Sequence, residues 1–386
     1  MLYGTPLYQE ASETQKLALN HMHWFANYNY ISDSETETVN FNQITAGVFD
    51  TIGFCKTLSQ ELALETEQEH SHINAFRRIG LMTAANVVGR AGLSEMPKWN
   101  SYRMPMGADS MLTSQYYVLR ALAKRMYNRV RPQYSHYLTD LEAKDRFILR
   151  APTTGMLGRS LEFSIPLQSF FGFNWGGGSP FMACQFYAVR MIANLYLKNM
   201  EYTVVKYSRD LEKADEPVPT PTAISHYHFL DEAFHTTISQ VLARDLYKEF
   251  AKPTAYESFV ANMGIYMLQR GTLGGLSGIL PHRYFNDDLT IMGLVYQLLQ
   301  GPVFGMSAAS ALHWTEQCFC HDHDGFHLAV KNRQHLLQDL QRFFQNFEYL
   351  WPVNREMRVM AARGSIQTAI QKNRQTFARF SQLATA

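Results

Sequence analysis

The sequence predicts an all-α protein with a ferritin-like helical bundle at its centre. Apolar residues recur at helical spacing through several long stretches, while turn pairs typical of β-hairpins are scarce. Hydrophobic residues make up 46% of the 386 residues, which is enough to build a large buried core. The formal net charge of +1 gives no argument for nucleic acid as a partner.

The first part of the chain predicts a pair of helices. Ser12 and Gln15 have the spacing of a capping box, which marks the start of a helix. A second helical pattern covers about residues 57–79, and Gly80 is expected to end it. Gly53 lies between the two patterns, where the turn of a helix hairpin is expected.

Further helices follow along the rest of the chain. Residues 109–150 predict two helices with a break near Pro132. A long helix is expected from about Phe181 to Leu211, and a segment with three prolines at 215–222 separates it from the next helix. Several more helices are expected after residue 254.

The helical patterns predict two parts of the chain. Residues 1–253 are expected to form the bundle, with a long insertion at about 81–180, and residues 254–386 to form a helical extension packed on it. No stretch of about 18 uncharged apolar residues occurs, so no membrane span is expected. The first residues do not resemble a signal peptide, and a cytoplasmic location is expected.

The most informative motif is HFLDEAFH, which contains His228, Glu232 and His235. Offsets of four and three residues place these side chains on one stripe of a helix. Imidazole and carboxylate ligands together suit iron, manganese or zinc. The alternative is a surface helix whose polar residues have helical spacing by chance.

A second motif, E-x-x-H, occurs in two registers within residues 61–72. Glu69 and His72 lie on a stripe that is otherwise mainly apolar, whereas Glu67 and His70 lie on a polar face. A carboxylate on a buried stripe is costly unless it is paired or binds a metal. The first pair is therefore the predicted ligand pair. Glu65 shares its stripe and is expected to support the ligands rather than bind metal.

Helix-hairpin geometry adds a further carboxylate. Glu201 is the only acidic residue between Glu162 and Asp210. The midpoint between Glu201 and Glu232 falls in the proline-rich break. If this break is the turn of an antiparallel pair, the two carboxylates lie at the same height.

The same geometry applies to the first hairpin. Glu35 and Glu69 are centred on residue 52, beside Gly53. Glu37 remains an alternative to Glu35, because its own stripe is also apolar. Two hairpins with carboxylates at matched depth predict a two-metal site.

The order Glu, E-x-x-H, Glu, H-x-x-x-E-x-x-H across residues 12–247 resembles the AurF-like family of di-iron enzymes, which is related to p-aminobenzoate N-oxygenase. It is also similar to the dimetal-carboxylate halogenases of cyanobacterial fatty-acid pathways. The resemblance implies that the metal ligands and catalytic residues are Glu35, Glu69, His72, Glu201, His228, Glu232 and His235.

The resemblance also implies an activity. Two iron ions, with manganese as an alternative at one site, would use dioxygen to oxidise a C–H or N–H bond of a small-molecule or acyl intermediate. The substrate would arrive free or bound to a carrier protein, an external electron donor would supply electrons, and a homodimer is compatible with the family. The alternatives are a halogenase that acts on a fatty acyl chain and a ferritin-like metal-binding protein without catalysis.

Overall fold

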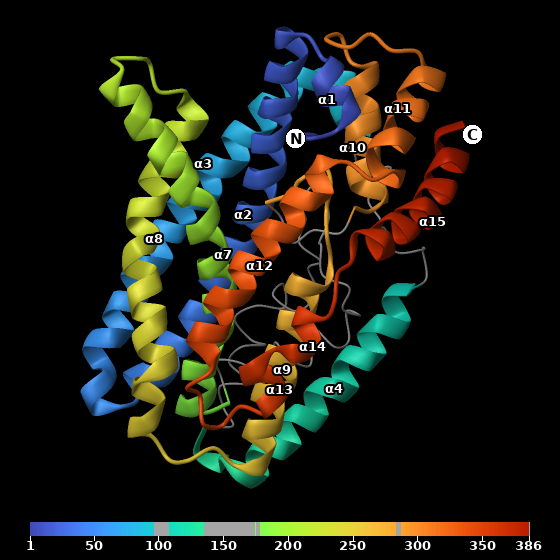
Figure 1. The fold of residues 1–386 in the computed structure, drawn as a ribbon. Helices are drawn as coiled ribbons and strands as arrows, with labels where there is room; N and C mark the ends of the chain where they lie inside the picture. The colour runs from blue at the N-terminus through green and yellow to red at the C-terminus, as the bar shows by residue number, and fades with distance from the viewer. Residues whose placement is uncertain (96–107, 135–173, 175–177, 283–286, 386) are drawn as a thin grey trace.

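The computed structural model describes residues 1–95, 108–134, 174, 178–282 and 287–385. These residues form helices and turns, and no strand occurs among them (Figure 1). The predicted all-α class is therefore confirmed. The second helix expected in residues 109–150 and most of the predicted insertion lie outside the described residues. The division into a bundle and an extension stays a prediction.

Four long helices form the central bundle as two antiparallel hairpins. The four are α2 (Glu13–Asp50), α3 (Lys56–Glu95), α7 (Pro180–Lys213) and α8 (Thr220–Arg244). Helix α2 packs along α3, and α7 packs along α8, while α2 and α7 join the two hairpins. Contact between α3 and α8 is sparser along the seam where these two helices meet.

Local sequence signals explain where the bundle helices begin and turn. Ser12 and Gln15 form the predicted capping box at the start of α2. The turn between α2 and α3 contains the short helix η1 (Gly53–Cys55), as Gly53 predicted. The side chain of Ser179 accepts a hydrogen bond from the amide of Met182, which caps α7. The proline-rich break is the turn between α7 and α8.

The prediction that Gly80 ends the second helix is wrong. Helix α3 continues to Glu95 and departs from helical geometry only at Gly89, where φ is 74°. A Cβ built at Gly80 would lie 3.5 Å from the Cβ of Tyr28 on α2. Gly80 therefore faces the partner helix from inside α3, and a methyl group at this position would be in ordinary contact with it.

Shorter helices surround the bundle. They are α1 (Pro6–Glu10), α4 (Ala108–Val130), η3 (Pro132–Tyr134), η4 (Leu246–Glu249), α9 (Ala255–Gly274), α10 (Leu289–Gln300), α11 (Ala308–Cys320), α12 (Asp324–Phe344), α13 (Pro352–Glu356), α14 (Arg358–Ala361) and α15 (Ile366–Thr385). Helices α9 and α12 pack against α7, and α10 packs against α3. Helices α10, α11 and α15 gather at one end of the bundle (Figure 1).

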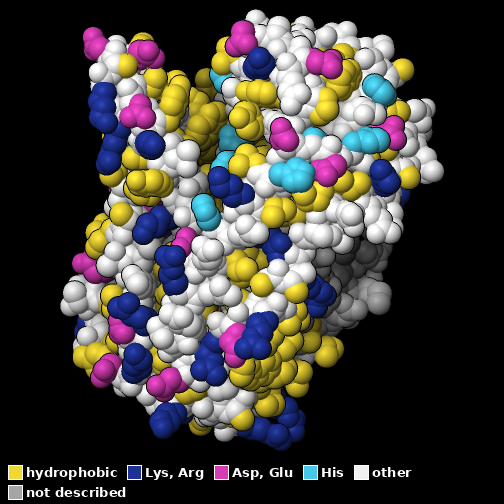
Figure 2. All heavy atoms as spheres, viewed as in Figure 1, with side chains coloured by type: hydrophobic (Ala, Val, Ile, Leu, Met, Phe, Trp, Pro, Cys, Tyr) yellow, Lys and Arg dark blue, Asp and Glu magenta, His cyan; other side chains and the backbone are white. Residues whose placement is uncertain are grey.

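Two large apolar cores stabilise this arrangement. One includes Phe25 of α2 and the buried faces of α10, α11 and α15. The other fills the bundle and extends to Phe344 of α12. On the face shown in Figure 2, basic and acidic side chains are interspersed, in keeping with the balanced charge. No helix in the described residues is both long and apolar enough to cross a membrane.

Candidate metal centre

The four bundle helices bring the seven predicted side chains together inside the protein. Helix α2 contributes one, α3 two, α7 one and α8 three. Six of them are buried, with exposed fractions of 0–7%: Glu35, Glu69, Glu201, His228, Glu232 and His235. The seventh, His72, has a side chain that is 12% exposed. The competing pair, Glu67 and His70, is exposed as its register predicted.

The first group of candidate ligands gathers around His228. One ligand atom from each of Glu35, His72, His228 and Glu232 lies within 4.8 Å of the others. The Nε2 of His228 is 2.8 Å from Oε1 of Glu35, and its Nδ1 is 2.6 Å from Oε1 of Glu201. Glu201 therefore contacts this group through His228. The side chain of the alternative, Glu37, is outside the described part of the chain.

A second group lies one helical turn further along the bundle. Its ligand atoms also lie within 4.8 Å of one another, and they belong to Glu65, Glu69 and His235. The two oxygens of Glu69 lie 3.4 Å from His235 Nδ1 and 3.2 Å from His72 Nδ1. Oε1 of Glu232 lies 2.8 Å from His235 Nδ1 and 3.7 Å from His228 Nε2. Two carboxylates thus stand between the groups, where bridging ligands of a two-metal site would stand.

A buried cation that the motif analysis missed lies beside the second group. Arg190 of α7 contacts Oε1 of Glu65 through Nη1, and its Nη2 is 2.8 Å from Oε1 of Glu69. Asn42 donates a further hydrogen bond of 3.0 Å to Glu65. Both donors contact the same oxygen of Glu65, so Glu65 is paired through Oε1. Arg190 precedes Glu201 on the same largely apolar helix by eleven residues, three helical turns, so a search for charged residues of either sign on that helix would also have found it.

Two polar side chains contact the outer nitrogens of the imidazoles at the seam between α3 and α8. The Nε2 of His72 is 3.2 Å from Oδ2 of Asp231, and the Nε2 of His235 is 3.1 Å from Oε1 of Gln68. Contacts of this kind fix the ring orientation and tautomer of a metal-binding histidine. The side chain of Asp231 is 47% exposed. In the sequence it therefore cannot be told from an ordinary solvated aspartate.

The ionisation of the cluster shows the cost of burying acids together. Burial raises the pKa of Glu35 to about 7, and it also raises the pKa of Glu201. Burial opposes ionisation of Glu232 as well, but the hydrogen bond from His235 and the charge of His228 outweigh it and hold its pKa at about 2. The pKa of His228 is raised well above its usual value, because the neighbouring glutamates outweigh the effect of burial. The cluster thus holds protons in place of a cation.

Unpaired atoms and charge both fit a pair of divalent metal ions. Three buried carboxylate oxygens have no hydrogen-bond partner within the described part of the chain, and they are Oε2 of Glu35, Glu65 and Glu201. Metal coordination is one of the few ways to satisfy such oxygens. The buried carboxylates of this cluster are Glu35, Glu65, Glu69, Glu201 and Glu232. Five negative charges and the single positive charge of Arg190 leave −4, which two divalent cations balance.

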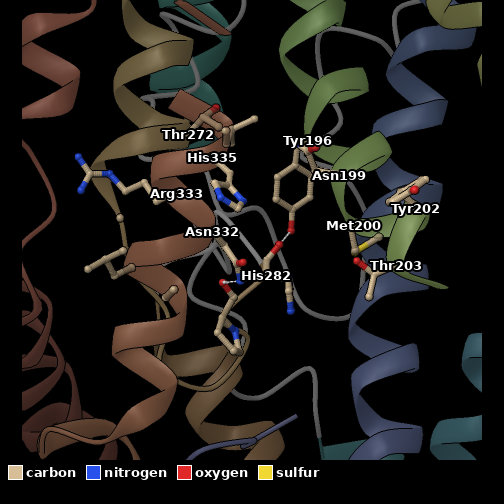
Figure 3. A pocket seen from close by; sticks show the side chains of 15 residues that line it. Tyr196, Asn199, Met200, Tyr202, Thr203, Thr272, His282, Asn332, Arg333 and His335 are labelled. Atoms are coloured by element: carbon tan, nitrogen blue, oxygen red, sulfur yellow. Dashed lines mark hydrogen bonds between the residues drawn. The ribbon is translucent and has the colours of Figure 1, made fainter. Parts of the chain in front are cut away.

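A separate cavity of about 270 Å³ opens on another face of α7 (Figure 3). Tyr196, Asn199 and Thr203 line it from α7, and the hydroxyl of Tyr196 donates to the backbone carbonyl of His282. None of the described residues that line this cavity belongs to the predicted metal set. The cavity is therefore distinct from the metal centre.

Comparison with known proteins identifies the family. A family model described as "Acyl halogenase CylC-like" matches residues 1–381. No curated protein and no solved structure matches the chain. CylC is a di-iron carboxylate halogenase, so the resemblance drawn from the ligand order is confirmed. The match supports an oxygen-dependent enzyme of the halogenase type, in a family that uses metal and oxygen. The chain belongs to the CylC-like acyl halogenase family.

Proposed function

We propose that this protein is a di-iron halogenase that uses dioxygen to replace a hydrogen atom of an acyl chain with a halogen atom. The observation that carries the proposal is the convergence of carboxylates and imidazoles from four helices into two adjoining groups inside a protein whose formal net charge is +1. The family description favours halogenation over the simple oxygenation first expected from the ligand motif. The family description also argues against a protein that stores metal without catalytic activity.

The side chains divide between the two metal ions according to the two groups. Glu35, His72 and His228 would hold one ion, and Glu201 would complete its surroundings beside His228. His235 would hold the other ion, and Glu69 and Glu232 would lie between the two. When bound, two iron ions supply the oxidising chemistry with dioxygen, and manganese is an alternative at one position.

The remaining residues shape and protect the centre. Asp231 and Gln68 orient the imidazoles of His72 and His235 from the seam. Phe76, which is buried, places its ring 4.9 Å from that of His228 and keeps water from this side. Glu65 is paired with Arg190. The other four carboxylates of the centre therefore remain to neutralise the charge of the metal ions. A dry centre strengthens each of these electrostatic interactions.

The overall reaction has a definite balance. A C–H bond, a halide ion, dioxygen, two electrons and three protons give a carbon–halogen bond and two water molecules. The carbon is oxidised and dioxygen is reduced, so an external electron donor must supply the two electrons. The family description supports an acyl chain as the substrate, either free or carried by a protein. A homodimer stays a prediction.

A product analysis tests this proposal. The protein is loaded with ferrous iron and supplied with dioxygen, a chemical reductant and a panel of free and carrier-bound acyl chains, with chloride, with bromide or without halide. We expect mass spectrometry to show products with the isotope pattern of the halide supplied. An oxygenated product that forms equally without halide would support the oxygenase alternative and contradict our proposal. Iron uptake without dioxygen consumption would support the metal store.

A further inference from the structure

A buried guanidinium lies against the candidate metal centre, and the proposed ligand set does not use it. Arg190 is 6% exposed and comes from the middle of α7. Its Nη2 lies 2.8 Å from Oε1 of Glu69, a predicted ligand, and its Nη1 contacts Glu65. The neighbouring charges of Glu65, Glu69 and Glu232 outweigh the effect of burial and raise its pKa, so the group stays charged.

The guanidinium is held in place by a chain of polar contacts that crosses the bundle. Glu65 accepts hydrogen bonds from Arg190 and from Asn42, the latter at 3.0 Å. The hydroxyl of Tyr187 donates to Oδ1 of Asn42 at 3.0 Å, and Thr45 lies 2.9 Å from the same hydroxyl. All five side chains are buried. Such a network fixes the position of Arg190 before any ligand arrives.

Arg190 also has hydrogen-bond donors that its two carboxylate contacts do not use. A guanidinium carries five N–H groups. Among the described residues it donates to two carboxylate oxygens, one from Nη1 and one from Nη2. The side chain of Arg190 is 5% exposed, and the side chain of Glu65 is 0% exposed. N–H groups therefore remain for a small anion beside Glu69.

We propose that Arg190 binds the halide ion that the reaction consumes, on the side of the metal centre formed by Glu69. This inference rests on the proposed function and adds the place of its inorganic substrate. An anion between a guanidinium and a metal ion has two cationic partners in a medium of low dielectric constant. Chloride and bromide are the ligand class that this site fits, because the remaining N–H groups offer donors to a small monovalent anion.

Charge makes halide binding depend on the metals. Without them the five buried carboxylates and Arg190 sum to −4 when ionised, and an anion is repelled. Two divalent cations bring the sum to zero and remove this barrier. Binding is then reciprocal, so halide must tighten metal binding by the same factor by which the metals tighten halide binding.

The test measures halide binding without turnover. Protein loaded with ferrous iron is kept free of dioxygen and titrated with chloride in a calorimeter, and crystals soaked in bromide are examined by anomalous diffraction. The variant is the double substitution Glu65→Gln with Arg190→Gln, which removes one charge of each sign and keeps the total unchanged. We expect its chloride Kd to rise about 10- to 100-fold, as for the loss of a charged hydrogen bond, with iron content unchanged.

A control comes from another Arg–Glu pair, in which the glutamate is buried and the arginine is 17% exposed. Nε of Arg131 lies 3.2 Å from Oε1 of Glu257, at the junction of η3 and α9. Replacing both with Gln should leave the chloride Kd as in the unmodified protein. The unmodified protein should also bind no chloride when its metals have been removed.

Several results would overturn the inference while leaving the proposed function intact. One is a double variant that binds iron and chloride like the unmodified protein. Another is a bromide peak that is not within hydrogen-bond distance of Arg190. If the double variant does not fold, the bromide position in unmodified crystals decides alone. Failure of the proposed function would instead appear as the absence of halogenated product from the unmodified enzyme.

Discussion

Glu69 and Glu67 lie two positions apart on α3 and have opposite surroundings. The first is buried against His72, His235 and Arg190, and the second is exposed. We expect Glu69→Gln to lower bound iron by about one ion per chain, because an amide oxygen replaces an anionic ligand. Glu67→Gln should leave iron content unchanged. Metal analysis after desalting measures both, and equal losses in the two variants would contradict the proposed register.

Asp231 gives a prediction about orientation rather than ligation. Asp231→Asn keeps the shape of the side chain but weakens its contact with Nε2 of His72. We expect metal affinity to fall about 10- to 100-fold, as for the loss of other carboxylates that support a histidine ligand. Competition with a chelator measures this affinity. Asp210→Asn, on the exposed part of α7, is the control and should have no effect.

The sequence predicts single residues well where a polar side chain interrupts an apolar stripe. This contrast separates Glu69 from Glu67, whereas Glu201 stands out as the only acidic residue between Glu162 and Asp210 and by its distance from the turn. The structure places Glu69 and Glu201 inside the bundle. Arg190 carries the same signal, but a search for metal ligands does not look for cations. Asp231 carries no such signal, because its role follows from contact with a residue on another helix.

At the scale of helices, the two hairpins follow from simple geometry. Antiparallel helices rise equally per residue, so partners at one height are equidistant from the turn. This places Glu35 opposite Glu69 and Glu201 opposite Glu232, and both predicted turns occur where expected. The end of α3 could not be found in this way. A glycine that ends a helix and a glycine that lies inside a helix against a neighbouring helix cannot be told apart in the sequence.

Two glycines of α3 test this distinction. Gly80→Ala should raise the free energy of unfolding by about 0.5–1 kcal/mol, because alanine favours a continuing helix and its Cβ would be in ordinary contact with Tyr28. Gly89→Ala should lower it by about 1 kcal/mol or more, because φ at Gly89 is 74°. Chemical denaturation measures both. Destabilisation by Gly80→Ala would contradict the expectation that a methyl group fits between α3 and Tyr28.

At the scale of the whole molecule, the sequence predicts the fold class but not the full arrangement of helices. The sequence predicts several helices after residue 254, yet their positions depend on contacts between distant segments. The core that joins Phe25 to Phe319 and Phe380 brings together residues from both ends of the chain. No local sequence pattern indicates which apolar helix faces pack against each other.

The buried charge of the metal centre makes the stability of the whole protein depend on metal. The five carboxylates and Arg190 sum to −4 when all are ionised, and after removal of the metals only bound protons can offset this charge. We expect chelation to lower Tm by roughly 10 °C, since two tightly bound ions each stabilise only the folded state. Thermal unfolding with and without a chelator, followed by addition of iron, measures the effect. An unchanged Tm after complete metal removal would contradict the site.

The metal-free protein should also lose stability as pH rises. Burial raises the pKa of Glu35 from 4.5 to about 7. A group with a raised folded pKa stabilises the fold below its unfolded pKa, and this contribution is lost as pH rises through the folded value. Between pH 6 and 8, Glu35 alone should cost about 1 kcal/mol, and the raised pKa of His228 acts in the same direction. Metal-loaded protein should lack this slope, because the ions hold Glu35 ionised throughout, and Glu35→Gln should reduce it in the metal-free form. Stability that increases from pH 6 to 8 after metal removal would show that protons do not replace the cations in this core.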